Sequence, residues 1–522
     1  MRISEKNQLS AEQSVACNSS GMGIVVSASA GAGKTKVLVS RLVKRCLEDN
    51  PRVPLSRILA LTFTEAAASE MKKRVAQELN EIKQLAEKED NVNQELIQYI
   101  DDQIIVLASA NITTIDSFCL SIIKKYYNII GLDPATTENI LSSGQNENIQ
   151  RDAFMRALEY AYQTNPQETV ALASYFSSRA DDYDGLYDAV VKINRHAESS
   201  VDPDEWYQHA LKMYPKKFDP TSSNNFTSFD AFDINIRKYF FASLYGQLAV
   251  LQRDIEILQE LPEAVNGRGK VIDNSVAFDT FLNIIQTLQN ELMPENEHSA
   301  YTFEIYQNYK QQIQMMDDTK LASYKKENYP EHARAMDHLK KTLKNLSEER
   351  LNEDDFVSDA RDASIINTAL INLAKNTYQN CVRIKQENTA MYFSDMERYA
   401  YEILKHENVA KVIRDNLQEV MIDEFQDTSK LQDTIIEMIA SPNCIFRVGD
   451  TKQSIYRFRQ AKPSLMRSKL NESEKIVEET IDTSMQSAKI ILSRNYRSDA
   501  RIIQFTNILF QKIMNVKEST EK

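Results

Sequence analysis

The chain has 522 residues, of which 42% are hydrophobic and 26% are charged, a balance usual for a globular protein of several domains. Its longest apolar runs, such as 104–108, are too short to cross a membrane, and the first ten residues lack the apolar core of a signal peptide. Five scattered cysteines, none in a CxxC pair, favour reduced thiols over a disulfide framework, so we expect a cytoplasmic protein that does not contact membranes.

The net charge of −13, taken alone, argues against a nucleic-acid partner, but the charges are unevenly distributed. Residues 131–410 carry a net charge of −16, whereas residues 1–130 carry +1 and residues 411–522 carry +2. Between Cys444 and Lys469 there are seven basic residues and a single acid. This basic run predicts a phosphate-facing surface in the C-terminal part of the chain.

Strand and helix patterns alternate at the start of the chain. A short apolar strand at 24–26 is followed by a loop of Gly, Ala and Ser and by a helical pattern at 34–47. A second strand at 58–63 leads into a strong helix-forming segment at 65–79. This alternation predicts an α/β domain with a parallel sheet, whose ligand binds at the carboxyl ends of the strands.

From about residue 146 to 410 the strand signals nearly vanish and helical periodicity takes over. Loops or mobile connectors are expected at 221–229 and 320–329. The α/β pattern then returns, with strands at 420–423, 445–448 and 490–492 and helices at 431–440 and 499–514. The sequence therefore predicts one α/β domain that is interrupted by a large all-helical insertion.

The segment ASAGAGKT lies between the first strand and its helix, where a phosphate-binding loop belongs. Lys34 would reach the β- and γ-phosphate oxygens, and the Thr35 hydroxyl would ligate Mg²⁺. Ala28 stands where the usual GxxxxGKT pattern has glycine, so a glycine-rich helix cap is the alternative. The loop residues that would cradle the phosphates with their backbone N–H groups are Ala28, Ser29, Ala30, Gly31, Ala32, Gly33, Lys34 and Thr35.

The segment VMIDEFQDT, at 420–428, places two carboxylates at the end of an apolar strand. Asp423 suits magnesium binding, directly or through water, and Glu424 suits the base that orients an attacking water. The alternative is a charged strand end that precedes a helix cap.

DEFQDT resembles motif II of the UvrD/Rep-like superfamily 1 helicases, and further segments resemble other motifs of that family in the family's order. LSAEQSVA resembles the Q motif, and its Gln13 would read the adenine edge. TFTEAAASEM at 62–71 and TIDSF at 114–118 resemble motif Ia, a single-stranded DNA contact, and the TxHSF element that follows it. VGDTKQSIYRFR at 448–459 resembles motif III, and NYRS at 495–498 resembles motif IV.

The resemblance implies roles for single residues. Gln453 would sense the γ-phosphate, Tyr496 would lie against the adenine, and Arg497 would be an arginine finger supplied by the chain itself. For Phe63 and Phe458, core packing is the alternative to stacking on bases. The implied DNA-contacting residues are Thr62, Phe63, Thr64, Thr114, Tyr456, Phe458 and Arg459.

Three features favour the AddA/RecB branch: KQSIYRFR, the very long segment before motif II, and YFSDME at 392–397, which resembles the branch's DFxDLE. FRQAKP and ASAGAGKT point to the AddA type of Gram-positive bacteria, and the resemblance covers about 1–130 and 385–515. Glu65, Asp116 and Gln460 stand where the family usually has Asn, His and Gly. An acid at position 65 or 116 would repel a DNA phosphate.

The resemblance implies a RecA-like motor domain at 1–130 and 385–495, a helical insertion domain at 131–384, and the truncated start of a second motor domain at 496–522. Motifs V and VI and a nuclease domain would lie beyond it.

The implied cofactors are ATP and Mg²⁺, and the implied partners are single-stranded and duplex-end DNA and an AddB-type (RexB-type) subunit. The implied function is a 3′-to-5′ ATP-dependent helicase motor in double-strand break repair and recombination. The alternative is an ATP-responsive DNA-end-binding or partner-docking fragment without productive turnover.

Overall fold

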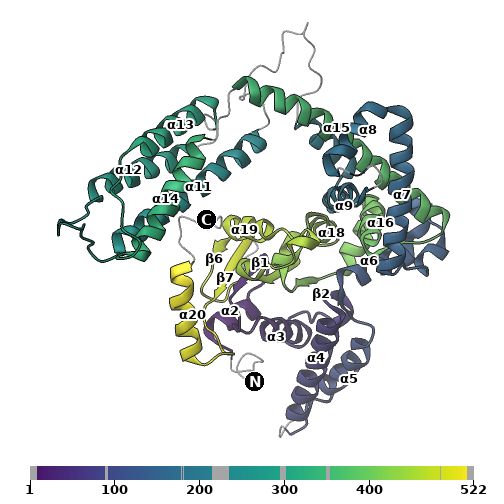
Figure 1. The fold of residues 1–522 in the computed structure, drawn as a ribbon. Helices are drawn as coiled ribbons and strands as arrows, with labels where there is room; N and C mark the ends of the chain where they lie inside the picture. The colour runs from purple at the N-terminus through teal and green to yellow at the C-terminus, as the bar shows by residue number, and fades with distance from the viewer. Residues whose placement is uncertain are drawn as a thin grey trace. The chain divides into compact units, whose positions relative to one another are not determined.

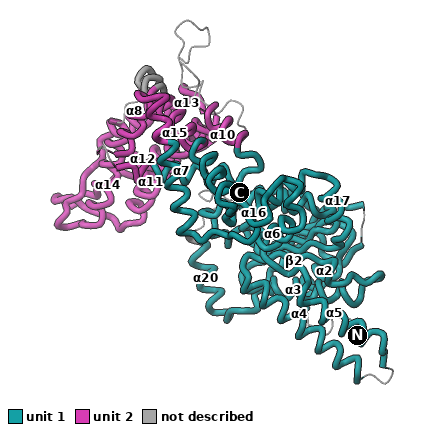
Figure 2. The backbone as a smooth tube through the Cα atoms, turned by 90° about the vertical axis from the view of Figure 1, so that its right-hand side faces the viewer, with its two compact units in different colours: residues 1–157, 187–203, 376–522 teal, residues 158–186, 204–375 magenta. Residues whose placement is uncertain are grey.

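The computed structural model describes residues 9–88, 92–177, 179, 182–213, 234–293, 301–348, 353–481 and 484–513. The chain divides into two compact units (Figure 2). Unit 1 comprises residues 1–157, 187–203 and 376–522, and unit 2 comprises residues 158–186 and 204–375. No helix in the described ranges is both long and apolar enough to cross a membrane.

Unit 1 is built on a seven-stranded sheet in which every neighbouring pair of strands is parallel. Central strand β1 pairs with two strands, and Val26 is level with Val448 on one side and with Ile490 on the other. In sheet order the strands are β3 (Asn111–Thr114), β2 (Ile58–Thr62), β4 (Glu419–Ile422), β5 (Ile445–Gly449), β1 (Gly23–Ala28), β7 (Ser487–Leu492) and β6 (Glu474–Lys475).

Both faces of this sheet are covered by helices, which explains why its central strands are almost continuously apolar. Successive residues of β2 alternate between two hydrophobic cores, with Ile58 and Ala60 in one and Leu59 and Leu61 in the other. The first core receives α2 (Ala11–Asn18), α3 (Lys34–Leu47), α4 (Glu65–Ala86) and α5 (Gln94–Leu107). The second receives α6 (Ile115–Tyr126), α16 (Phe393–Leu404), α17 (Glu407–Asn416), α18 (Lys430–Ile439) and α19 (Pro463–Glu472) (Figure 1).

Between β3 and β4 the described residues form helices and loops and contain no named strand. Four helices of unit 2 share one core, which contains Phe241, Phe281, Tyr309 and Leu339. These helices are α11 (Ile234–Glu260), α12 (Ser275–Leu292), α13 (Phe303–Asp318) and α14 (Pro330–Glu348). The remaining helices between β3 and α16 are α7 (Ser143–Thr164), α8 (Pro166–Phe176), α9 (Asp184–Glu198), α10 (Pro203–Lys212) and α15 (Glu353–Glu387).

The structure confirms the predicted α/β class and parallel sheet. The strands and helices expected at both ends of the chain are present, and α20 (Ala500–Ile513) is the last described helix. Residues 320–329 form the expected loop, whereas 221–229 lie outside the described residues. Strands β3 and β6 and helices α2, α5, α6 and α19 were not predicted.

Candidate functional site

The glycine-rich loop leaves the end of β1 and runs into α3. Gly31 and Gly33 have φ angles of 73° and 87°, in the left-handed region that glycine adopts without strain. A Cβ atom on Gly31 would lie 2.8 Å from Asn495 Oδ1, and one on Gly33 would lie 2.7 Å from Gln13 Nε2. Helix α3 begins at Lys34, and no described side chain caps it. Its first turn therefore presents backbone N–H groups to a bound anion.

Gln13 supports this loop from α2. Its Nε2 donates a hydrogen bond of 2.9 Å to the carbonyl of Ala32, and its Oε1 accepts one of 3.1 Å from the backbone N–H of Ser10. Ser10 caps α2 and completes a capping box with Gln13. Both ends of the amide are thus engaged within the protein, and the predicted adenine contact stays a prediction.

The two carboxylates of the DEFQDT segment follow β4, which lies two strands away from β1. The Lys34 ammonium lies 2.6 Å from Oε2 of Glu424 and forms an ion pair with it. Glu424 adopts a φ of 50°, which is uncommon for a residue other than glycine and is typical of functional sites. The pKa of Asp423 is raised to about 6, first by burial and then by the charge of Glu424, while the charge of Lys34 opposes the rise.

The segment that follows β5 contributes Gln453 and the aromatic residues. Asp450 caps the short helix Thr451–Gln453, and its Oδ2 accepts a hydrogen bond of 2.7 Å from Gln453 Nε2. Gln453 therefore lies on the same edge of the sheet as Glu424, because both follow neighbouring parallel strands.

The aromatic residues predicted to bind DNA form one cluster. The rings of Phe63 and Tyr456 have centroids 4.3 Å apart, and those of Tyr456 and Phe458 are 5.7 Å apart. The Arg459 guanidinium lies 5.2 Å from the centre of the Phe63 ring. Phe458 is 66% exposed, so the core-packing alternative is wrong for this residue, and Phe63 is half-buried.

The three threonines predicted to contact DNA have local structural partners. Thr62 is buried and donates to the carbonyl of Thr64, while Thr64 and Thr114 are the N-caps of α4 and α6. The hydroxyl of Thr114 also donates a hydrogen bond of 2.7 Å to Glu65. These contacts fix where β2 and β3 end and where the following helices begin.

Glu65, which is expected to repel a DNA phosphate, is exposed, and its carboxylate is held by two hydroxyl groups. Oε1 of Glu65 accepts hydrogen bonds of 2.7 Å from the hydroxyls of both Thr114 and Ser117. These two bonds lower the pKa of Glu65, so the carboxylate stays ionised, and the predicted repulsion of a DNA phosphate stays a prediction.

Asp116 forms a carboxyl pair with Glu397 of α16. Burial raises the pKa of Asp116, and burial together with the charge of Asp116 raises the pKa of Glu397 to about 8. Nε2 of Gln432 donates a hydrogen bond of 2.7 Å to Glu397. The raised pKa of Glu397 favours a proton held between the two carboxyl groups, and the charge of Arg459 opposes the rise in the pKa of Asp116.

The NYRS segment packs directly on the glycine-rich loop. The backbone N–H of Tyr496 donates a hydrogen bond of 2.9 Å to the carbonyl of Gly31. Asn495 Nδ2 donates one of 2.8 Å to the carbonyl of Ala30. Tyr496 is 57% exposed, and the side chain of Arg497 is also exposed. Both residues are therefore available to a ligand bound at the loop.

Only part of the basic run at 444–469 is exposed and could form the predicted phosphate-facing surface. The side chain of Arg447 is buried and lies 3.4 Å from Asp433, and Lys469 lies 2.8 Å from Glu437. Arg457, Arg459 and Lys462 are exposed. The prediction was wrong for Arg447 because this residue lies within β5, which is buried on both faces of the sheet.

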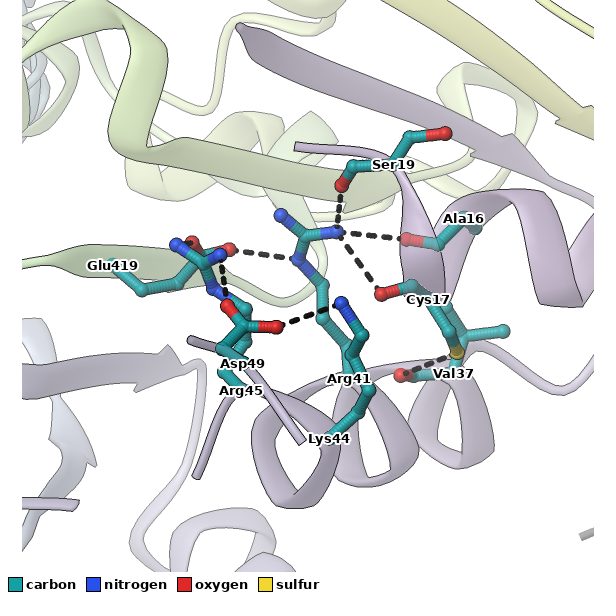
Figure 3. A network of polar contacts seen from close by, with 9 residues as sticks. All are labelled: Ala16, Cys17, Ser19, Val37, Arg41, Lys44, Arg45, Asp49 and Glu419. Atoms are coloured by element: carbon teal, nitrogen blue, oxygen red, sulfur yellow. Dashed lines mark hydrogen bonds and ion pairs between the residues drawn. The ribbon is translucent and has the colours of Figure 1, made fainter. Parts of the chain in front are cut away.

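A buried ionic network behind the loop was not predicted from the sequence (Figure 3). Arg41 of α3 donates a hydrogen bond of 2.7 Å to the carboxylate of Glu419 in β4. It also donates hydrogen bonds to the carbonyls of Ala16, Cys17 and Ser19. Arg41 is 3% exposed and Glu419 is 2% exposed. The network joins α2, α3 and β4, the three elements that carry Gln13, Lys34 and Asp423. The sequence signal that could have indicated this network is the charged Arg41 within the apolar run VLVSRLV.

A parallel sheet with a glycine-rich loop after one strand and a paired carboxylate after another defines the class of P-loop proteins, which bind nucleoside triphosphates. The model of the UvrD/REP helicase N-terminal domain matches residues 9–266 and 259–474, so the chain belongs to this family.

Similar proteins that are named as subunits of an ATP-dependent helicase/nuclease occur in several bacteria. The protein of Pediococcus pentosaceus is 30% identical over 97% of this chain and 39% of its own length. That of Latilactobacillus sakei is 31% identical over 99% of this chain and 56% of its own length, and that of Acetivibrio thermocellus is 29% identical over 98% and 40%. The chain thus spans about two fifths of the length of most of these relatives, and the resemblance to the amino-terminal part of an AddA-type protein is confirmed.

Proposed function

We propose that unit 1 is the ATP-binding motor domain of a DNA helicase of the AddA type. The observation that carries the proposal is the meeting of two sites on one sheet edge. The Lys34–Glu424 pair follows β1 and β4, and the Phe63–Tyr456 pair follows β2 and β5. Nucleotide and single-stranded DNA would therefore bind to loops that follow neighbouring strands at the same edge of the sheet.

The loop residues 28–35 would hold the phosphates of ATP, with Lys34 on the β- and γ-phosphate oxygens. Thr35 and Asp423 offer hard oxygen ligands of the kind Mg²⁺ prefers, and the buried Asp423 carboxyl, with its raised pKa, would gain from a cation. When bound, Mg²⁺ would neutralise charge on the phosphates. Glu424 would orient the attacking water, Gln453 would sense the γ-phosphate, and Arg497 and Tyr496 would contact the phosphate and the adenine.

The exposed aromatic cluster suits contacts with successive bases, since stacking contributes about 1–3 kcal/mol per base and is tolerant of sequence. Arg459 would add a phosphate or cation–π contact. Opening and closing of the nucleotide site would then move these contacts along a strand. The proposed direction is 3′ to 5′, and the proposed setting is double-strand break repair and recombination in the cytoplasm.

The proposed domains are a RecA-like motor domain at 1–130 and 385–495, a helical insertion at 131–384, and the start of a second motor domain at 496–522. The relatives are named as subunits of a helicase/nuclease, which supports a partner chain, and we propose that this partner is of the AddB type. Duplex-end DNA is the proposed substrate of the assembled enzyme.

Binding of ATP and of DNA can be tested directly on the 522-residue chain. Calorimetry with a magnesium-loaded non-hydrolysable ATP analogue and fluorescence anisotropy with a mixed-sequence single-stranded oligonucleotide should both show saturable binding. ATP turnover measured with and without the oligonucleotide then separates a working motor from a fragment that binds without turnover. Absence of binding to either ligand would refute the proposal.

A further inference from the structure

Gln426 lies between the nucleotide residues and the DNA cluster, and it is 1% exposed. Its Nε2 donates hydrogen bonds of 2.8 Å to Glu424 Oε2 and 3.2 Å to Asp427 Oδ2. Its Oε1 accepts one of 2.9 Å from the backbone N–H of Asp450. Because both ends of the amide are engaged, its orientation is fixed by three separate groups.

The second carboxylate in this chain of contacts, Asp427, reaches the aromatic residues. Its Oδ1 accepts a hydrogen bond of 3.1 Å from the hydroxyl of Ser454, and the carboxylate also accepts one from the backbone N–H of Tyr456. The Tyr456 ring in turn lies against Phe63. One amide and one carboxylate thus connect Glu424 to the proposed base-stacking surface.

The packing around Gln426 leaves its amide little freedom. A Cβ atom built on Gly449 would lie 2.4 Å from Gln426 Oε1 and 2.8 Å from the sulfur of Met466. Glycine at position 449 therefore permits the close approach of the amide to the backbone. A displacement of the Gln426 side chain would have to move the Gly449–Asp450 peptide as well, since interiors this dense transmit strain.

A triphosphate would act on the first link of this chain. Lys34 is paired with Glu424, and Lys34 must turn toward the β- and γ-phosphate oxygens when a nucleotide binds. Glu424 would then keep the hydrogen bond from Gln426 but lose its cation. Since the Glu424 backbone is in a sparsely populated conformation, the loss of that ion pair favours a second position for this residue.

We infer that Gln426 is a positioning residue that couples occupancy of the γ-phosphate site to the affinity of the Phe63–Tyr456 surface for single-stranded DNA. The inference rests on the proposed function. Coupling of this kind is reciprocal, so DNA must change the affinity for the triphosphate by the same factor as the triphosphate changes the affinity for DNA.

The test is a linkage measurement on the complete chain. The Kd of a fluorescent single-stranded oligonucleotide is measured by anisotropy without nucleotide, with a magnesium-loaded non-hydrolysable ATP analogue, and with Mg²⁺ and ADP. In the wild type the analogue should change this Kd by roughly 5–150-fold, the usual range for allosteric coupling, and ADP should change it less.

Two variants interrupt the chain of contacts differently. Gln426→Ala removes all three hydrogen bonds, whereas Gln426→Glu is nearly isosteric and keeps the acceptor for Asp450 but loses the donor to Glu424 and Asp427. Both should bring the ratio of the two Kd values to about one while the affinities for the analogue alone and DNA alone stay near wild type. Gln103→Ala is the matched control, because Gln103 is a buried glutamine that accepts a hydrogen bond of 2.9 Å from Leu55. It should keep the wild-type ratio.

A wild-type ratio in Gln426→Glu, or a ratio of one in the wild type, would overturn the inference and leave the proposed function standing. Equal losses of both separate affinities in the two variants would assign Gln426 a purely structural role and also overturn it. A wild-type chain that binds neither ligand would overturn the proposed function, and the coupling with it.

Discussion

The ammonium of Lys34 lies 2.6 Å from the carboxylate of Glu424, so the start of α3 and the end of β4 are joined by an ion pair. This pair brings together two residues that are 390 positions apart in the sequence. Under the proposed function, the phosphates of a bound nucleotide would compete with Glu424 for the Lys34 ammonium.

Replacement of Lys34 by Ala should abolish binding of an ATP analogue. The loop would lose the cation that is proposed to contact the β- and γ-phosphates. The fold should survive, since the Lys34 side chain is not part of either core of the sheet. Calorimetry measures the affinity, and the melting temperature reports the fold. Lys73→Ala, on the exposed surface of α4, is the control; wild-type affinity in Lys34→Ala would refute the loop assignment.

Phe458→Ala should weaken binding to mixed-sequence oligonucleotides by one base stack, about 1–3 kcal/mol. Arg457→Ala and Arg459→Ala should each reduce the salt dependence of binding by about one counterion if the residue contacts a phosphate. Anisotropy titrations at several salt concentrations measure both quantities. Tyr239→Ala removes a ring from unit 2 that is even more exposed than Phe458 and should leave both quantities unchanged. Unchanged affinity and salt slope in all three site variants would mean that DNA binds elsewhere.

The carboxyl pair of Asp116 and Glu397 predicts a pH-dependent stability. The pKa of Glu397 is raised from 4.5 to about 8, so between these values the folded protein holds a proton that the unfolded chain has released. The contribution of this proton to the free energy of unfolding is therefore fully present below about pH 4.5 and is lost as the pH rises through about 8. The loss is at most about 1.4 kcal/mol per pH unit for one proton. The other charged groups acting on the pair are Glu65, Arg398 and Arg459.

Asp116→Asn should reduce the dependence of stability on pH. The pKa of Glu397 is raised by burial and by the charge of Asp116, and this substitution removes that charge. Urea denaturation at pH 5, 7 and 8 measures the slope. Asp102→Asn, at an exposed position of α5, is the control and should keep the wild-type slope. If Asp116→Asn kept it too, the two carboxyl groups would not share a proton.

Much of the fold followed from local patterns, and the exceptions have physical reasons. The apolar runs of β1, β2, β4 and β5 are recognisable because parallel strands covered on both faces need apolar side chains throughout. Strand β3 was missed because Asn111–Thr114 contains a single apolar residue, and β6 because it consists of two exposed charged residues at the sheet edge. Both are held by backbone pairing with a neighbouring strand, which a local pattern does not report.

The site was predictable where one short segment carries its chemistry, as in the loop at 28–35 and in Asp423 and Glu424. It was not predictable where partners come from distant segments. The hydrogen bonds to Glu65 come from the hydroxyls of Thr114 and Ser117, which the pairing of β2 with β3 brings to it. The role of Gln426 likewise depends on the close approach of Gly449 in a neighbouring strand.

Glu419→Gln should lower the free energy of unfolding by about 3–5 kcal/mol, because it leaves the buried Arg41 without its ionised partner. Arg45 also loses a contact of 3.0 Å with the same carboxylate. Urea denaturation followed by circular dichroism gives the value. The exposed pair of Glu70 and Arg74 provides a control, and Glu70→Gln should change stability little. A similarly small effect of Glu419→Gln would show that the network contributes no more than a surface pair.

The last prediction concerns ATP turnover by the 522-residue chain. The candidate catalytic residues of this chain are Lys34, Glu424, Gln453 and Arg497. A well-placed arginine finger contributes roughly 10³–10⁵ in rate in related enzymes, and a poorly held one forfeits most of that. Arg497 is exposed, and its backbone N–H is bonded to Asn495.

We therefore expect the chain to bind ATP, to hydrolyse it slowly with little stimulation by single-stranded DNA, and to separate no duplex. A coupled ATPase assay with and without oligonucleotide measures the first two quantities, and a fluorescent forked duplex measures the third. Arg497→Ala is the informative variant: if Arg497 is poorly held, its removal should lower the slow rate only slightly. Strong DNA-stimulated hydrolysis with strand separation by the purified chain, abolished in Arg497→Ala, would show instead that these residues form a complete motor.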